Sequence, residues 1–192
     1  LEEISTAVSE GARLGIPTAA HCIGGQGLKD CIDGGVDVIE HMYMAAEQDV
    51  ERLAASRCVV DLTSGIFLDP SREEFLSPAN ALKVRLNRSR VRENVARIIK
   101  ARLPFVLGTD AYHGFLYREV GYAVELGSDP VTAIQGVTSR AARVCRLEDR
   151  IGKLENGMEA DIIAVEGNPL EDVSRLSQVG LVMKGGVVYR QP

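Results

Sequence analysis

Four short apolar runs recur along the first three-quarters of the chain, and segments with helical spacing lie between them. The runs predict buried strands at residues 16–21, 36–41, 58–63 and 104–109. Apolar positions spaced along one face predict helices at residues 1–14, 28–32, 47–56, 85–102, 116–126 and 130–144. A long polar connection at residues 64–80 interrupts the alternation, and we interpret it as a solvated linker in preference to an active-site lid.

The pattern changes after Arg150, where glycines separate short β-rich runs at residues 160–165, 180–183 and 187–189. Lys184, Gly185 and Gly186 join the last two runs, which predicts a β-hairpin with a glycine turn. We therefore divide the chain into a βα-repeat region, residues 1–146, and a small β-rich tail, residues 147–192.

Four strands that alternate with helices imply a parallel sheet. A closed (β/α) barrel needs eight such units and about 250 residues, so residues 1–146 form either half of a barrel or an open doubly wound sheet. Half a barrel would leave two long edge strands unpaired, which either lowers stability or requires a partner. An open doubly wound sheet that binds a small ligand is disfavoured, because Asp30 stands where the third glycine of a G-x-G-x-x-G motif would follow Gly25 and Gly27.

Composition narrows the partners of this 192-residue chain. The 22 Lys and Arg against 27 Asp and Glu give a formal charge of −5, which argues against nucleic acid even though the predicted helix at residues 85–102 is rich in arginine. No apolar run approaches the length of a membrane span. Four scattered cysteines without a C-x-x-C pair predict reduced thiols in a cytoplasmic protein. The chain begins at Leu1, so we expect a processed start or a fragment of a longer protein.

Candidate chemistry lies at the ends of three predicted strands. His21 ends the first strand, His41 ends the second, and Asp110 follows the fourth. The carboxyl ends of parallel strands carry the active site in both open and closed α/β sheets. Imidazole and carboxylate are ligands that a hydrolytic zinc uses. Each histidine taken alone is more often a hydrogen-bonded rim residue, and Asp110 could instead cap the following helix.

Several motifs together resemble the second half of an amidohydrolase-superfamily barrel with part of its β-sandwich, in the imidazolonepropionase-like and prolidase-like group. They span essentially the whole chain. They are Ala20-His21, Ile39-Glu40-His41, Gly108-Thr109-Asp110-Ala111, Thr138-Ser139-Arg140-Ala141-Ala142, the glycine-framed residues 152–157, Glu159-Ala160-Asp161 with the aliphatic run after it, and Asn168-Pro169-Leu170.

The resemblance implies roles for individual residues. His21 and His41 correspond to the metal ligands of barrel strands five and six, and Asp110 to the strand-eight aspartate that binds metal and acts as general base. Zinc is the divalent metal we favour, although iron or manganese would suit the same ligands. His113, in the loop after Asp110, is a candidate substrate contact, with Arg118 a weaker one nearby. The first-strand His-x-His pair and the strand-four ligand of the family have no counterpart here.

We therefore expect a partial (β/α) barrel, strands five to eight, followed by a β-sandwich segment. The expected reaction is metal-dependent hydrolysis of an amide, peptide or cyclic amide C–N bond in a small-molecule or dipeptide substrate. Because ligands are missing, the chain alone should bind metal weakly and turn over little substrate. The alternative is a non-catalytic fragment or subunit that pairs with a complementary N-terminal half or forms a homo-oligomer.

Overall fold

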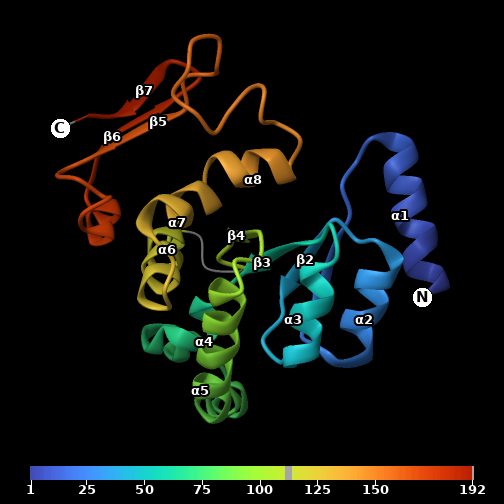
Figure 1. The fold of residues 1–192 in the computed structure, drawn as a ribbon. Helices are drawn as coiled ribbons and strands as arrows, with labels where there is room; N and C mark the ends of the chain where they lie inside the picture. Colours follow the sequence, from blue (N-terminus) through green and yellow to red (C-terminus); the bar gives the residue numbers. More distant parts are fainter. Residues whose placement is uncertain (111–113, 192) are drawn as a thin grey trace.

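The fold is built on a four-stranded parallel sheet in the order β1-β2-β3-β4 (Figure 1). The computed structural model describes residues 1–110 and 114–191. The strands are β1 (Ala19–Cys22), β2 (Val38–His41), β3 (Val59–Leu62) and β4 (Phe105–Leu107), each shorter than the predicted run but inside it or within one residue of it. The chain is thus a mixed α/β fold with a parallel sheet, as predicted.

Helices make every connection between these strands. In chain order the helices are α1 (Glu2–Leu14), which precedes the sheet, the connecting helices α2 (Gly25–Gly34), α3 (Glu47–Ala54), α4 (Gly65–Leu68) and α5 (Pro78–Lys100), with a 3₁₀ turn η1 (Pro70–Phe75), and α6 (Leu116–Glu125), α7 (Pro130–Gly136) and α8 (Ser139–Val144), which follow β4. The single helix predicted at residues 130–144 is wrong, because α7 ends at Gly136, which packs against Leu107 of β4. No helix in residues 1–110 and 114–191 is both long and apolar enough to cross a bilayer.

One face of the sheet forms the core with the helices. Ile39, Val60 and Leu107 project from the strands into a buried cluster with residues of α2, α3, α5, α6 and α7. The alternate positions form a row of a different kind, because strand register places His21 beside Glu40 and Glu40 beside Asp61. His21 is exposed, and Glu40 and Asp61 are half-buried. The second face of the sheet therefore presents a polar row.

The polar connection predicted at residues 64–80 is folded, so the solvated-linker interpretation is wrong. It forms α4, η1 and the first residues of α5, which starts at Pro78 behind the capping residue Ser77. Phe67 and Leu68 are buried here. The segment contains many charged residues and therefore looks solvated in the sequence. Composition does not reveal that some of these residues are buried in ion pairs.

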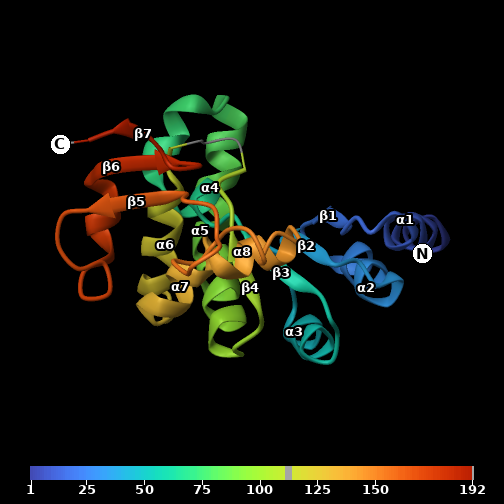
Figure 2. The same ribbon diagram turned by 90° about the horizontal axis from the view of Figure 1, so that it is seen from above.

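A second, antiparallel sheet closes the chain. It comprises β5 (Ile162–Val165), β6 (Val179–Lys184) and β7 (Val187–Arg190), and the turn between β6 and β7 holds Gly185 and Gly186. Its 3₁₀ turn η2 (Val173–Ser177) packs on the main core through Val173 and Leu176. This sheet lies on the α6 side of the molecule, far from α1 in both views (Figures 1 and 2).

Candidate active site

The parallel register brings the two predicted histidine ligands together. His21 lies in β1, and His41 is the last residue of β2, paired in register with Cys22, the neighbour of His21. Their imidazole rings meet edge to face with centroids 4.5 Å apart. Residues that are 20 positions apart in sequence thus form one imidazole pair at the carboxyl edge of the sheet.

The backbone and its neighbours hold His41 in a defined orientation. Its φ of 79° lies in the left-handed region, which residues with a Cβ adopt rarely and which often marks functional sites. Nδ1 of His41 lies 2.6 Å from Oγ1 of Thr63, whose hydroxyl also contacts the hydroxyl of Tyr43. Tyr43 in turn donates to the Thr63 carbonyl over 2.8 Å. A buried hydrogen-bond network of Thr63 and Tyr43 therefore supports His41 on its Nδ1 side.

The hydrogen bonds of this network determine which ring nitrogen of His41 carries the proton and which is free. Tyr43 has one proton and donates it to the Thr63 carbonyl, so the Thr63 hydroxyl donates to Tyr43 and accepts from Nδ1 of His41. Burial, followed by the proximity of His21, lowers the pKa of His41 below 6.5. A neutral ring with its proton on Nδ1 carries its lone pair on Nε2, as a metal ligand requires.

Asp110 lies at the same edge but is not a helix cap. Helix α6 begins at Leu116 with Phe115 at its N-cap position, so the capping interpretation of Asp110 is wrong. Its side chain is exposed, and its negative charge raises the pKa of His41, against the larger lowering by burial. Asp110 also has a positive φ of 58°, which aspartate tolerates better than most residues.

Asp61 is a further acidic residue in this region that sequence reasoning missed. Its Oδ1 is buried and has no hydrogen-bond partner within the described chain. Burial, then the charges of Glu40 and Asp110, raise the pKa of Asp61 to about 6. A Cβ on Gly108 would lie 2.9 Å from Oδ2 of Asp61, so the glycine makes room for the carboxyl group. The available signal was a charged residue inside the apolar run 58–63.

The donor set fits a divalent metal only in part. His21 and His41 supply an imidazole pair and Asp110 a carboxylate at the same edge, the ligand types used by hydrolytic zinc. Residues 1–110 and 114–191 nevertheless contain no group of three or more metal-ligating side chains close enough to hold an ion together. His113 lies outside the described residues, so its predicted substrate contact stays a prediction.

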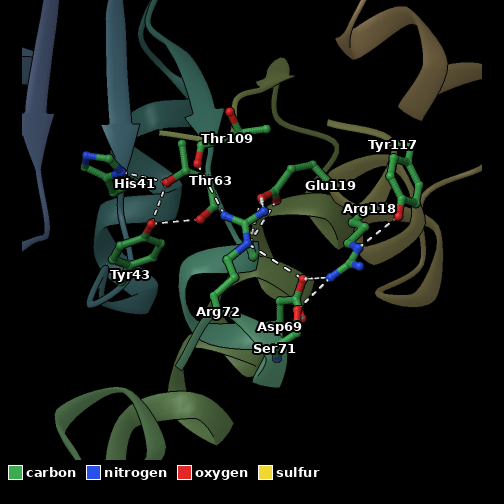
Figure 3. A network of polar contacts seen from close by, with 11 residues as sticks. His41, Tyr43, Thr63, Asp69, Ser71, Arg72, Thr109, Tyr117, Arg118 and Glu119 are labelled. Atoms are coloured by element: carbon green, nitrogen blue, oxygen red, sulfur yellow. Dashed lines mark hydrogen bonds and ion pairs between the residues drawn. The ribbon is translucent and has the colours of Figure 1, made fainter. Parts of the chain in front are cut away.

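A buried charge network adjoins the site and was also missed (Figure 3). Arg72 of η1 pairs with Glu119 of α6, and Arg118 pairs with Asp69. Arg118 also donates to Ser71 Oγ over 2.8 Å. These contacts occupy the Arg118 guanidinium, so Arg118 has protein partners in place of the predicted substrate contact.

The Amidohydrolase family profile matches residues 1–189. Ochratoxinase from Aspergillus niger is 33% identical over 204 residues, covering all of this chain and 42% of that protein. Imidazolonepropionase from Desulfotalea psychrophila is 24% identical over 151 residues, covering 76% of this chain and 32% of that protein.

Solved structures give the same result. A Xaa-Pro dipeptidase crystallised with methionine in its active site superposes with a TM-score of 0.89 at 30% identity, over 98% of this chain and 48% of that one. The A. niger ochratoxinase structure gives 0.84 at 30% identity, over 100% of this chain and 45% of that one. The chain spans less than half the length of these relatives. On the extent of the profile match and on these similarities, the chain belongs to the amidohydrolase family.

Proposed function

We propose that this chain is the C-terminal portion of a metal-dependent amidohydrolase, holding barrel strands five to eight and a segment of the β-sandwich. The observation that carries the proposal is the imidazole pair at the carboxyl edge of β1 and β2, with Nε2 of His41 free to ligate. The lengths of the relatives support it, because each is more than twice as long as this chain. The polar row His21, Glu40 and Asp61 lies on the face that a completed barrel would enclose.

The proposed reaction is hydrolysis of an amide, peptide or cyclic amide C–N bond in a small molecule or dipeptide. Similarity to a Xaa-Pro dipeptidase and to ochratoxinase supports this class of substrate. His113, in the loop beyond Asp110, is proposed to contact the substrate.

The residues of this chain divide the chemistry between them. His21 and His41 would hold a divalent metal, zinc in preference to iron or manganese, and Thr63 keeps His41 in the ligating tautomer. A metal bound there would supply a Lewis acid that lowers the pKa of water and polarises the substrate carbonyl. Asp110 accepts a proton from the attacking water on a carboxylate oxygen and transfers it to the leaving nitrogen.

The chain alone supplies an incomplete ligand set, so a partner is part of the proposal. A complementary N-terminal half would cover the polar row and add the missing ligands, and a second copy of the chain is the alternative. A non-catalytic fragment remains the competing function, favoured by the absence of a three-ligand group among the described residues.

Zinc titration of the dialysed 192-residue chain tests the proposal. We expect weak binding that falls at least about tenfold in His21→Ala and in His41→Ala. Asp149→Asn, an exposed carboxylate on the α8–β5 connection, is the matched control and should bind like the parent. No zinc binding by the parent chain, or equal binding in all four proteins, would overturn the proposed metal site and favour the non-catalytic fragment.

A further inference from the structure

A fully buried ion pair stands directly behind the candidate site. Arg72 and Glu119 each have 0% of their surface exposed, and Nη2 of Arg72 lies 3.0 Å from Oε1 of Glu119. Arginine and glutamate are almost never fully buried unless paired. Such a pair is weak evidence for stability, because removing both charges from water offsets their mutual attraction. Its contacts with the backbone therefore indicate what it contributes.

The guanidinium of Arg72 reaches the segment that carries Asp110. Its Nη1 donates to the carbonyl oxygen of Thr109 over 3.3 Å. That carbonyl belongs to the peptide unit joining Thr109 to Asp110, so the hydrogen bond restricts the orientation of the peptide plane that precedes Asp110. Asp110 lies past the end of β4 with a positive φ, where the strand ladder no longer constrains the backbone.

The carboxylate of Glu119 reaches the corresponding segment after β3. Both of its oxygens accept from the backbone N–H of Gly65, each over 3.0 Å. Gly65 follows Thr63 by two residues, and Thr63 is the residue that contacts Nδ1 of His41. The ion pair thus joins the backbone that supports His41 to the backbone that carries Asp110 (Figure 3).

The surroundings are shaped to keep this geometry. A Cβ on Gly65 would lie 2.5 Å from both Nη2 of Arg72 and Oε1 of Glu119, so only glycine fits. A second pair, Arg118 with Asp69, lies on the outer side, and Oδ2 of Asp69 is 3.7 Å from Nε of Arg72. The two arginines and the two carboxylates balance in charge. Glu119 and Asp69 both lie near the guanidinium of Arg72 and help to fix its orientation.

We propose that Arg72 and Glu119 are positioning residues that set the placement of Asp110 relative to the histidine pair. This inference rests on the proposed function, because it assigns Asp110 to the metal site. Arg72 uses two separate nitrogens for Glu119 and for Thr109, a fork that lysine cannot reproduce from one ammonium group. Arg72→Lys keeps the charge beside Glu119 and loses the hold on the Asp110 peptide.

A double-mutant cycle between Arg72 and Asp110 tests the proposal, with the zinc affinity of the complete 192-residue chain as the readout. Asp110→Asn should weaken zinc binding. Arg72→Lys should weaken it about tenfold, in the range typical of residues that orient metal ligands. In the Asp110→Asn background, Arg72→Lys should have no further effect beyond about twofold, because the group it positions is already lost.

Two further proteins separate positioning from folding. Arg92→Lys alters an exposed ion pair with Glu125, on the same helix as Glu119 but outside the buried network, and should leave zinc affinity unchanged. Arg72→Met/Glu119→Gln removes both buried charges while an amide oxygen remains for Gly65; it should fold, by circular dichroism, yet bind zinc as weakly as Asp110→Asn.

The outcomes are distinguishable. The positioning role alone is overturned if Asp110→Asn loses zinc affinity while folded Arg72→Lys and folded Arg72→Met/Glu119→Gln both bind zinc like the parent. An equal loss from Arg72→Lys with and without Asp110 overturns it as well, since the effect then does not pass through Asp110. Unchanged affinity in Asp110→Asn overturns the role of Asp110 in the proposed metal site, and the positioning inference fails with it.

Discussion

Replacing Asp61 with asparagine should remove a loss of stability that the parent protein suffers as the pH rises. The Asp61 carboxyl group lies between Glu40 on the neighbouring strand and the chain beyond Gly108, and its buried Oδ1 has no hydrogen-bond partner within the described chain. Ionising such a group is unfavourable, because burial removes water and nearby carboxylates repel the charge. Asparagine has nearly the same shape and carries no charge at any of these pH values.

The size of the effect follows from the pKa difference. The pKa of Asp61 rises from an ordinary 3.8 to about 6 in the folded protein, which corresponds to up to about 3 kcal/mol. The folded state holds this proton more tightly than the unfolded chain, so the contribution of Asp61 to stability is largest below pH 4 and falls until the pH passes 6. Glu119, whose pKa burial raises to about 7, contributes a similar fall in both proteins, which cancels in the difference except for the smallest cause of its shift, the charge of Asp61.

Urea unfolding of metal-free protein, monitored by circular dichroism from pH 4.5 to pH 8, measures this difference. The free energy of unfolding of Asp61→Asn minus that of the parent should grow by about 2 kcal/mol across the range, because about 1 kcal/mol of the full effect is already present at pH 4.5. Asp149→Asn, at an exposed position, should follow the parent at every pH. Parallel stability curves for the parent and Asp61→Asn would refute the reasoning, because they would mean that Asp61 ionises as easily in the folded protein as in the unfolded chain.

Two other predictions concern packing and thiol exposure. Gly65→Ala should lower the free energy of unfolding by at least about 2 kcal/mol in urea titrations, because its Cβ would collide with the Arg72–Glu119 pair. Gly121→Ala, whose Cβ would meet nothing within 4 Å on α6, is the control and should raise stability by about 0.5–1 kcal/mol; equal effects would contradict the collision. Only Cys145 of the four free cysteines is exposed, so one thiol per native chain should react with a colorimetric disulfide reagent, and none in Cys145→Ser. A second reactive thiol would contradict the burial of Cys31, where burial also raises the pKa to about 11.

Strands and the histidine pair could be predicted because both follow from local rules. An apolar run identifies a strand in a parallel sheet, and the sheet's topology places the carboxyl ends of its strands along one edge. His21 and His41 needed no further information to be brought together. The strand boundary was less predictable: the run starts at Ile16, whereas β1 starts at Ala19, after Thr18 donates its N–H and its hydroxyl to Oδ2 of Asp37.

The charge network could not be predicted, because its members lie far apart in the sequence. Arg72 and Glu119 are 47 residues apart, and Gly65 and Glu119 are 54 apart. In the sequence, Arg72 stands among other charged residues and looks like part of a solvated segment. Only the tertiary fold shows that it is buried, since its partner Glu119 comes from α6, which packs against α4 and β4.

The same contrast distinguishes the ligand pair from the residues that would make it work. A histidine at a strand end can lie near another histidine in any parallel sheet, but ligation also requires a free nitrogen and a fixed ring. Thr63 and Tyr43 supply both for His41 through hydrogen bonds that start from the end of the adjacent strand. Because Glu119 holds the backbone just beyond Thr63, the support of His41 and the placement of Asp110 depend on one buried carboxylate. Glu119 is therefore the residue through which the two halves of the candidate site should be energetically coupled.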